Sequence, residues 1–187
     1  MTVELTRQLH RMCSESGPLS VYSSRWWLNL AMVAAAFMLV LLAGCQSVPT
    51  ELHCAVNSVH DGDTLRVTCG GQRMKIRLYC IDAPEIRQRP WGKESRDYLR
   101  SIAPLRVLVI AKNKDRYGRT VGEVLTADSD RRNLNLAMVQ AGMAVVYERY
   151  CDESRYHRAE KAARERRAGV WSKSGLQQRP WVTRHRK

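Results

Sequence analysis

Three short segments of the sequence concentrate carboxylates and arginines where the chain is expected to turn. They are Asp61-Gly62-Asp63-Thr64, the run RLYCIDAPE from Arg77 to Glu85, and Asp115-Arg116-Tyr117-Gly118-Arg119. Aspartates at a hairpin tip and at a strand end can converge on a hard cation such as Ca²⁺, which prefers oxygen ligands. A nearby glutamate could orient or deprotonate a water molecule, and two arginines could hold a phosphate. The three segments together indicate chemistry at a phosphate group.

Each segment taken alone also has an ordinary structural explanation. Asp61-Gly62 is common turn chemistry, and Tyr117-Gly118 marks another turn. Arg77 on the polar face of a strand would simply be solvated. The functional interpretation therefore depends on the segments occurring together and in order.

The hydrophobic pattern predicts the elements that must position these segments. Period-two alternation indicates strands and apolar residues at helical spacing indicate helices. The predicted strands cover 52–59, 64–69, 72–81, 106–110 and 120–126, the helices cover about 92–102, 133–141 and 154–168, and 144–147 is a short extended run. Five strands with a helix after the third predict an α+β protein, a five-stranded OB-fold β-barrel with about three helices. Barrels of this type commonly bind nucleic acid.

Four motifs, taken in order, resemble the thermonuclease family of Ca²⁺-dependent, staphylococcal nuclease-like enzymes. They are DGDT, RLxxIDAPE, DRYGR and NLxxVxxG, and the resemblance covers about residues 54–171. It implies a monomeric phosphodiesterase that hydrolyses DNA and/or RNA with low sequence specificity and leaves 3′-phosphate products.

The resemblance also implies roles for the acidic residues. Asp63 and Asp82 would bind Ca²⁺ through their side chains, and Ala83 would bind it through its backbone carbonyl. Glu85 would act as general base on the attacking water, or at least position it. Asp61 would stand behind the metal ligands and support them.

The same resemblance assigns the substrate contacts. Arg77 and Arg119 would hold the phosphate and stabilise its five-coordinate transition state. Arg116 and Tyr117 would lie along the nucleotide, with Tyr150 as a further contact.

The sequence departs from the family pattern at three places. Ala83 stands where the best-known member has threonine, which a backbone ligand tolerates. The loop after Glu85 is shortened to residues 86–90, and Glu148 replaces a pocket tyrosine. These differences bear on substrate preference and rate rather than on the class of reaction.

The charge of the chain agrees with a polyanionic partner. The formal net charge is +13, and removing residues 1–44 leaves 28 − 16 = +12, so the basic character belongs to the domain. Two alternatives explain the charge without catalysis: a non-catalytic nucleic-acid-binding OB-fold module tethered to the cell envelope, and a protein that binds anionic lipid. The presence of Arg77, Glu85 and Arg119 favours the enzyme.

The N-terminal region is typical of a bacterial lipoprotein signal peptide. Arg25 precedes an uncharged apolar stretch, 26–43, which ends in Leu42-Ala43-Gly44-Cys45, a lipobox-like sequence. Residues 1–44 would be removed and Cys45 lipidated, followed by a tether at 45–51, the domain at 52–172 and a basic tail at 173–187. The alternative is an uncleaved single membrane-spanning anchor. Both place the domain in the cell envelope outside the cytoplasmic membrane. In the first case, a lipid would anchor it at the outer membrane or the periplasmic face.

Four cysteines remain in the predicted domain, and an even number in an oxidising compartment suggests disulfides. A hairpin centred between Asp61 and Gly62 pairs residues whose numbers sum to 123. It therefore pairs Cys54 with Cys69, and likewise Ser58 with Leu65. Cys80 and Cys151 pair by elimination, and four free thiols are the alternative. No CxxC or His/Cys spacing suggests zinc.

Overall fold

The computed structural model describes residues 51–184 of the chain. The segment 1–44, the lipidation site Cys45 and most of the tether lie outside the described residues. Between residues 51 and 184, no helix is both long enough and apolar enough to cross a membrane. The signal peptide and the lipid anchor therefore stay predictions.

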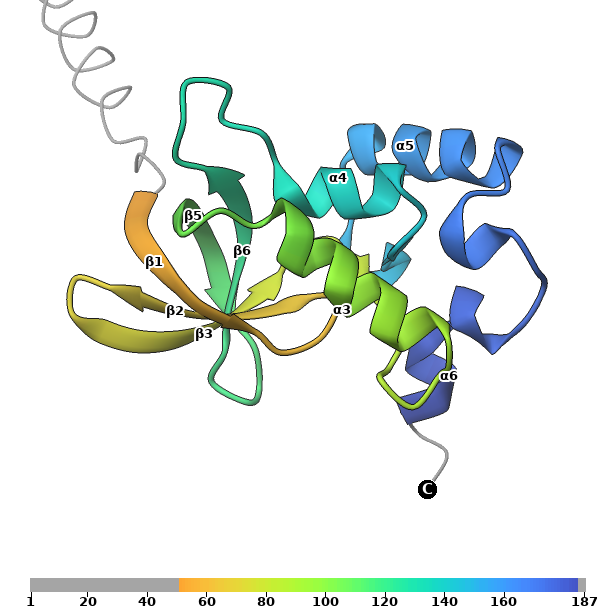
Figure 1. Ribbon diagram of the computed structural model, residues 1–187, viewed down its shortest axis with the longest axis horizontal. Coiled ribbons are helices and arrows are strands. Elements are labelled where there is room, and N and C mark those ends of the chain that lie inside the picture. Colours follow the sequence, from red (N-terminus) through yellow and green to blue (C-terminus); the bar gives the residue numbers. More distant parts are fainter. Residues whose placement is uncertain (1–50, 185–187) are drawn as a thin grey trace, which may run out of the picture. The chain divides into compact units, whose positions relative to one another are not determined.

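Five strands close into a barrel (Figure 1). They are β1 (Glu51–Val59), β2 (Thr64–Cys69), β3 (Gln72–Leu78), β5 (Arg106–Lys114) and β6 (Thr120–Thr126). The order around the barrel is β1-β2-β3-β6-β5, and β5 pairs with β1 to close it. Only β3 and β6 are parallel among these five. This arrangement confirms the predicted OB-fold of the α+β class.

The β1–β2 hairpin contains a bulge that shifts its register. Cys54 faces Cys69 as the sequence predicts, but Ser58 faces Arg66 rather than Leu65. The extra residue is Asn57, and the hairpin turn is centred on Gly62 instead of between Asp61 and Gly62. The two differences cancel at the cysteines. The predicted pairing of Ser58 with Leu65 is thus wrong, whereas the cysteine pairing is right.

The third strand ends earlier than the alternation predicts. Cys80 has φ = 71°, a left-handed conformation that interrupts a strand, and β3 stops at Leu78. After this turn, β4 (Ile81–Asp82) pairs with β7 (Val145–Val146) in a separate two-stranded sheet. The chain therefore leaves the barrel between the end of β3 and β4.

Three helices gather at one side of the barrel (Figure 1): α3 (Trp91–Ile102), α4 (Leu134–Gln140) and α5 (Ser154–Glu165). Asn133 caps α4, because its side chain accepts a 2.9 Å hydrogen bond from the backbone of Leu136. Helix α5 ends before the predicted position at 168, since Arg167 adopts φ = 52° and cannot continue it. Glu153, rather than Ser154, is the residue before its first turn.

Short helical turns complete the chain. They are η1 (Glu148–Tyr150), η2 (Gly169–Trp171), η3 (Leu176–Gln178) and α6 (Pro180–Arg184). The last two fall inside the segment that the sequence suggested to be a basic tail. The described part of this segment, up to residue 184, lies against the rest of the domain: the Gln88 side chain donates a 3.0 Å hydrogen bond to the Leu176 carbonyl.

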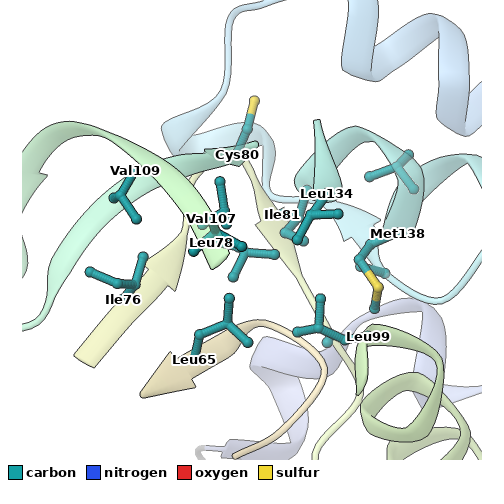
Figure 2. Packing of buried hydrophobic residues seen from close by; sticks show 14 of the residues in the cluster. Leu65, Ile76, Leu78, Cys80, Ile81, Leu99, Val107, Val109, Leu134 and Met138 are labelled. Carbon is teal, nitrogen blue, oxygen red and sulfur yellow. The ribbon is translucent and has the colours of Figure 1, made fainter. Parts of the chain in front are cut away.

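One hydrophobic core runs through the barrel and on beneath the helices (Figure 2). The barrel contributes fully buried side chains from β2, β3 and β5, including Leu65, Ile76 and Val109. Leu99 of α3 and Met138 of α4 continue the same cluster. Ile81 of β4 belongs to the same cluster, so the core joins the barrel, the helices and β4.

Two disulfides cross-link the domain, and both predicted pairings are confirmed. Cys54–Cys69 joins β1 to β2 with a Cα–Cα distance of 4.2 Å. Cys80–Cys151 joins the β3–β4 turn to the residue after η1, at 4.6 Å. The second bridge connects segments that are 71 residues apart in the sequence.

We expect the two bridges to differ in their contribution to stability. Replacing Cys54 and Cys69 together by alanine should lower the free energy of unfolding by about 3 kcal/mol, and replacing Cys80 and Cys151 by about 4 kcal/mol. The second loop is longer, so its closure restricts the unfolded chain more. Urea unfolding of the oxidised proteins measures both values. A larger loss from the shorter loop would contradict the chain-entropy explanation.

Candidate active site

The guanidinium of Arg77 lies between two carboxylates. Its Nη1 is 2.7 Å from Asp63 Oδ2, and its Nη2 donates a 2.7 Å hydrogen bond to Asp82 Oδ1. All three residues are buried: Arg77 is at the end of β3, Asp82 in β4 and Asp63 in the β1–β2 turn. The ordinary explanation, a solvated Arg77 on an exposed strand face, is therefore wrong, because the hairpin turn and β4 cover this residue.

The turn that carries Asp61 and Asp63 is packed closely against α3. A Cβ atom on Gly62 would lie 1.9 Å from Ser95 Oγ and 2.7 Å from the Ala83 Cβ, so only glycine fits. Asp63 is held further by its Oδ2, which accepts a 2.8 Å hydrogen bond from the Ala83 amide. The hairpin tip is thus held closely between α3, at Ser95, and Ala83, the residue that follows β4.

A third carboxyl group lies next to this cluster. Asp61 Oδ1 accepts a 3.1 Å hydrogen bond from the Asp63 amide. Burial and the neighbouring Asp63 carboxylate raise the pKa of Asp61 to about 7. Asp61 therefore adds a carboxyl group with a raised pKa beside the pair of aspartates that Arg77 joins.

Glu85 lies in a tight loop that leads into α3. The Glu85 amide donates to Gln88 Oε1 at 2.8 Å, and the Gln88 amide donates to the Glu85 carbonyl at 2.7 Å. Gly92 is required here as well, since a Cβ atom would lie 2.0 Å from the Glu85 carbonyl oxygen. The backbone of Glu85 is therefore fixed, and its side chain lines the cleft described below.

Arg119 is oriented by Asp115 across the β5–β6 turn. Asp115 Oδ2 accepts a 2.7 Å hydrogen bond from Arg119 Nε, and Oδ1 accepts from the amides of Tyr117 and Arg119 at 2.9 and 3.0 Å. Burial acts to raise the pKa of Asp115, but these hydrogen bonds from Arg119 and Tyr117 lower it below its usual value. An ionised Asp115 thus anchors the whole turn.

These elements surround a cleft of about 570 Å³. It brings together most of the residues that the sequence selected, which are Asp61, Asp63, Arg77, Ala83, Glu85, Arg116, Tyr117 and Arg119. Asp82 is fully buried and does not line the cleft, but it accepts a hydrogen bond from Arg77, which does. Tyr150 does not line the cleft; it is 56% exposed and its ring meets Tyr147 edge-on at 5.0 Å.

Sequence reasoning missed Lys75, Pro84, Tyr147 and Trp181, which also line the cleft. Lys75 could have been found, because it shares the polar face of its strand with Arg77. Tyr147, directly after β7, takes the place expected for Tyr150. Nothing in the local pattern pointed to Trp181, which comes from α6.

A closed OB-fold barrel with a cleft of carboxylates and arginines defines a protein suited to phosphate chemistry. Comparison with known proteins gives the family. Residues 75–173 match the family described as staphylococcal nuclease homologue. An uncharacterized endonuclease of Escherichia coli O157:H7 is 39% identical over 138 residues, which are 73% of this chain and 88% of that protein. A micrococcal nuclease of Shigella flexneri is 36% identical over 166 residues, 83% of this chain and 91% of that protein. The chain belongs to the staphylococcal nuclease homologue family and is a nuclease.

The anchoring of Arg119 yields a prediction. Replacing Asp115 by alanine removes the bonds to Arg119 Nε and to two turn amides. Turnover should fall about tenfold or more, because misplacing a catalytic group by about 1 Å can cost up to about 100-fold. Steady-state cleavage of plasmid DNA measures the effect.

A matched control is Asp128→Ala, which removes a similar turn anchor after β6. Asp128 accepts from Thr126 Oγ1 at 2.6 Å and from the Arg131 amide at 3.2 Å, and it does not line the cleft. Equal activity losses in the two variants would contradict a specific role for Asp115.

Proposed function

We propose that the protein is a Ca²⁺-dependent phosphodiesterase that hydrolyses DNA and/or RNA with low sequence specificity and leaves 3′-phosphate products. The observation that carries the proposal is the cleft itself. Glu85 lines this cleft together with Asp61, Asp63, Arg77 and Arg119. Each group has the chemistry that phosphodiester hydrolysis requires.

The composition of the cleft supports broad substrate use. Guanidinium groups, the Lys75 ammonium group and aromatic rings can contact phosphates and base faces. Phosphate contacts carry no sequence information, and both DNA and RNA present them. The net charge of +12 on residues 45–187 favours the approach of either polyanion.

The donor set fits a hard cation. In the described part of the chain, no group of three or more His, Cys, Asp or Glu side chains is arranged to hold a metal ion. The expected set needs only two side chains, Asp63 and Asp82, with the backbone carbonyl of Ala83, and all its donors are oxygen atoms. A divalent cation here would also offset the repulsion between the carboxyl groups of Asp61 and Asp63, which, after burial, is a cause of the raised pKa of Asp61.

Asp63, Asp82 and Ala83 would hold Ca²⁺, with Asp61 supporting Asp63 from behind. The bound ion would supply charge stabilisation at the phosphate. In this structure Arg77 pairs with both aspartates and holds their carboxylates close together.

Side chains of the protein carry out the proton transfer and stabilise the transition state. Glu85 takes the proton of the attacking water while the oxygen–phosphorus bond forms. The bond from phosphorus to the 5′ oxygen breaks, that oxygen takes up a proton, and the 3′ oxygen keeps the phosphate. Arg119, oriented by Asp115, and Arg77 donate to the non-bridging oxygens, whose negative charge increases in the transition state.

The reaction is tested at Glu85 and Arg119. Glu85→Gln should lower kcat by about 10²- to 10⁴-fold, and Arg119→Ala by about 10²- to 10³-fold. A chelator should abolish cleavage by the unmodified chain, and added Ca²⁺ should restore it. The measurement is oligonucleotide cleavage with identification of the product ends.

Glu94→Gln is the matched control, because Glu94 is an exposed acid in the first turn of α3 and does not line the cleft. It should retain full activity. Undiminished cleavage in chelator, undiminished cleavage by Glu85→Gln, or 5′-phosphate ends would refute the corresponding part of the proposal.

We further propose that a lipid on Cys45 holds the mature protein in the cell envelope outside the cytoplasmic membrane. Two observations support this location: the sequence Leu42-Ala43-Gly44-Cys45 after an apolar stretch, and two disulfides in the folded domain. Disulfides persist mainly in oxidising compartments.

The anchor is tested by replacing Cys45 with serine. The variant should lose incorporation of labelled fatty acid and accumulate as precursor, whereas Cys13→Ser, within the removed segment, should be processed normally. Mass spectrometry of the mature protein decides the point. An N-terminus other than residue 45 would show that the lipobox is not used.

A further inference from the structure

We propose that Trp181, which the C-terminal segment 174–184 brings into the cleft, is a substrate-binding residue that stacks on an unpaired base of the nucleic acid. The inference deepens the proposed function and rests on it. It assigns a substrate contact to a part of the chain that lies beyond the residues matched by the family, 75–173.

Trp181 forms an aromatic wall with Tyr147. The two rings are stacked, with centroids 5.7 Å apart and planes inclined by 13°. Tyr150 meets Tyr147 edge-on at 5.0 Å and 66°, so Tyr147 has aromatic neighbours on two sides. Trp181 lines the cleft and stays partly exposed. Trp181 has the larger of the two rings, so it provides more surface on which a ligand can stack.

The segment that carries Trp181 is held in place by the loop that follows Glu85. Arg87 Nη2 donates to the Thr183 carbonyl, and Gln88 Nε2 donates to the Leu176 carbonyl at 3.0 Å. These two residues belong to the shortened loop 86–90. The position of the tryptophan is thus linked directly to the loop that positions Glu85.

The rest of the cleft has the composition of a site for single-stranded nucleic acid. Tyr117, on the β5–β6 turn, is 69% exposed, and the Arg116 guanidinium lies 4.8 Å from its ring centroid. Lys75 and Arg119 add positive charge along the cleft. Basic groups that follow a backbone, combined with rings on which bases stack, are the usual means of binding unpaired nucleotides. The cleft volume of about 570 Å³ is within the range of small-molecule sites and leaves room for more than a phosphate.

The test compares the binding of short, fluorescently labelled oligodeoxynucleotides to the full chain, measured by anisotropy. Glu85→Gln is present in every protein so that the ligand stays intact. Trp181→Ala should weaken binding at least about fivefold, since stacking on one base contributes a factor of this size or more. Trp181→Phe should restore most of the affinity. Val182→Ala, in the same helix but outside the cleft lining, should bind like the parent.

A series of oligonucleotides with one abasic position at a time separates stacking from a structural role. In the parent protein, one abasic position should weaken binding markedly. In Trp181→Ala, that position should make little further difference, because the ring that used the base is gone. In active chains, Trp181→Ala should raise KM with a small change in kcat.

Three results would overturn the proposal. The first is parent-like affinity in Trp181→Ala. The second is an equal weakening of intact and fully abasic oligonucleotides, which would mean that Trp181 only supports the fold. The third, absence of oligonucleotide binding and cleavage by the unmodified chain, would remove the proposed function as well, whereas the first two would leave it standing.

Discussion

The active site depends on one buried guanidinium shared by two buried aspartates. Arg77 joins the hairpin tip at Asp63 to β4 at Asp82, with both contacts at 2.7 Å. Breaking such a cluster by removing one partner costs about 3–5 kcal/mol, because the remaining charges stay buried. Arg77 therefore contributes to the stability of the fold as well as to the proposed reaction. A loss of activity in an Arg77 variant could not be assigned to catalysis alone, because the fold would be destabilised too.

Helices α3 and α4 hold the segments that carry this cluster in place. Helix α3 packs so closely on the hairpin tip that Gly62 has no room for a side chain. The buried amide of Asn135 accepts from the Val124 backbone at 3.0 Å and donates to the carbonyls of Tyr79 and Gly122 at 3.0 and 3.1 Å. One side chain thus ties α4 to β6 and to the turn at which β3 gives way to β4. The catalytic groups stand on a rigid support.

The walls of the cleft come from segments that are distant in the sequence. The β5–β6 turn contributes Arg119 and Tyr117, both organised by the Asp115 carboxylate. The opposite aromatic pair combines Tyr147 with Trp181 from α6. Cys80–Cys151 connects the β3–β4 turn to the chain just beyond Tyr147, and so links the floor of the site to that wall.

Local chemistry in the sequence determined the barrel strands and the residues of the cleft floor, because alternation, turn residues and short motifs involve near neighbours in the chain. The cysteine pairing was also predicted correctly, although the bulge and the shifted turn cancel at Cys54 and Cys69 and the second bridge joins segments 71 residues apart. Tertiary structure alone decided the rest. The bulge at Asn57 and the left-handed Cys80 are backbone adjustments that let the hairpin and β4 meet around Arg77. The positions of Tyr147 and Trp181 depend on how separate segments pack, and no local pattern records which ring will face the cleft.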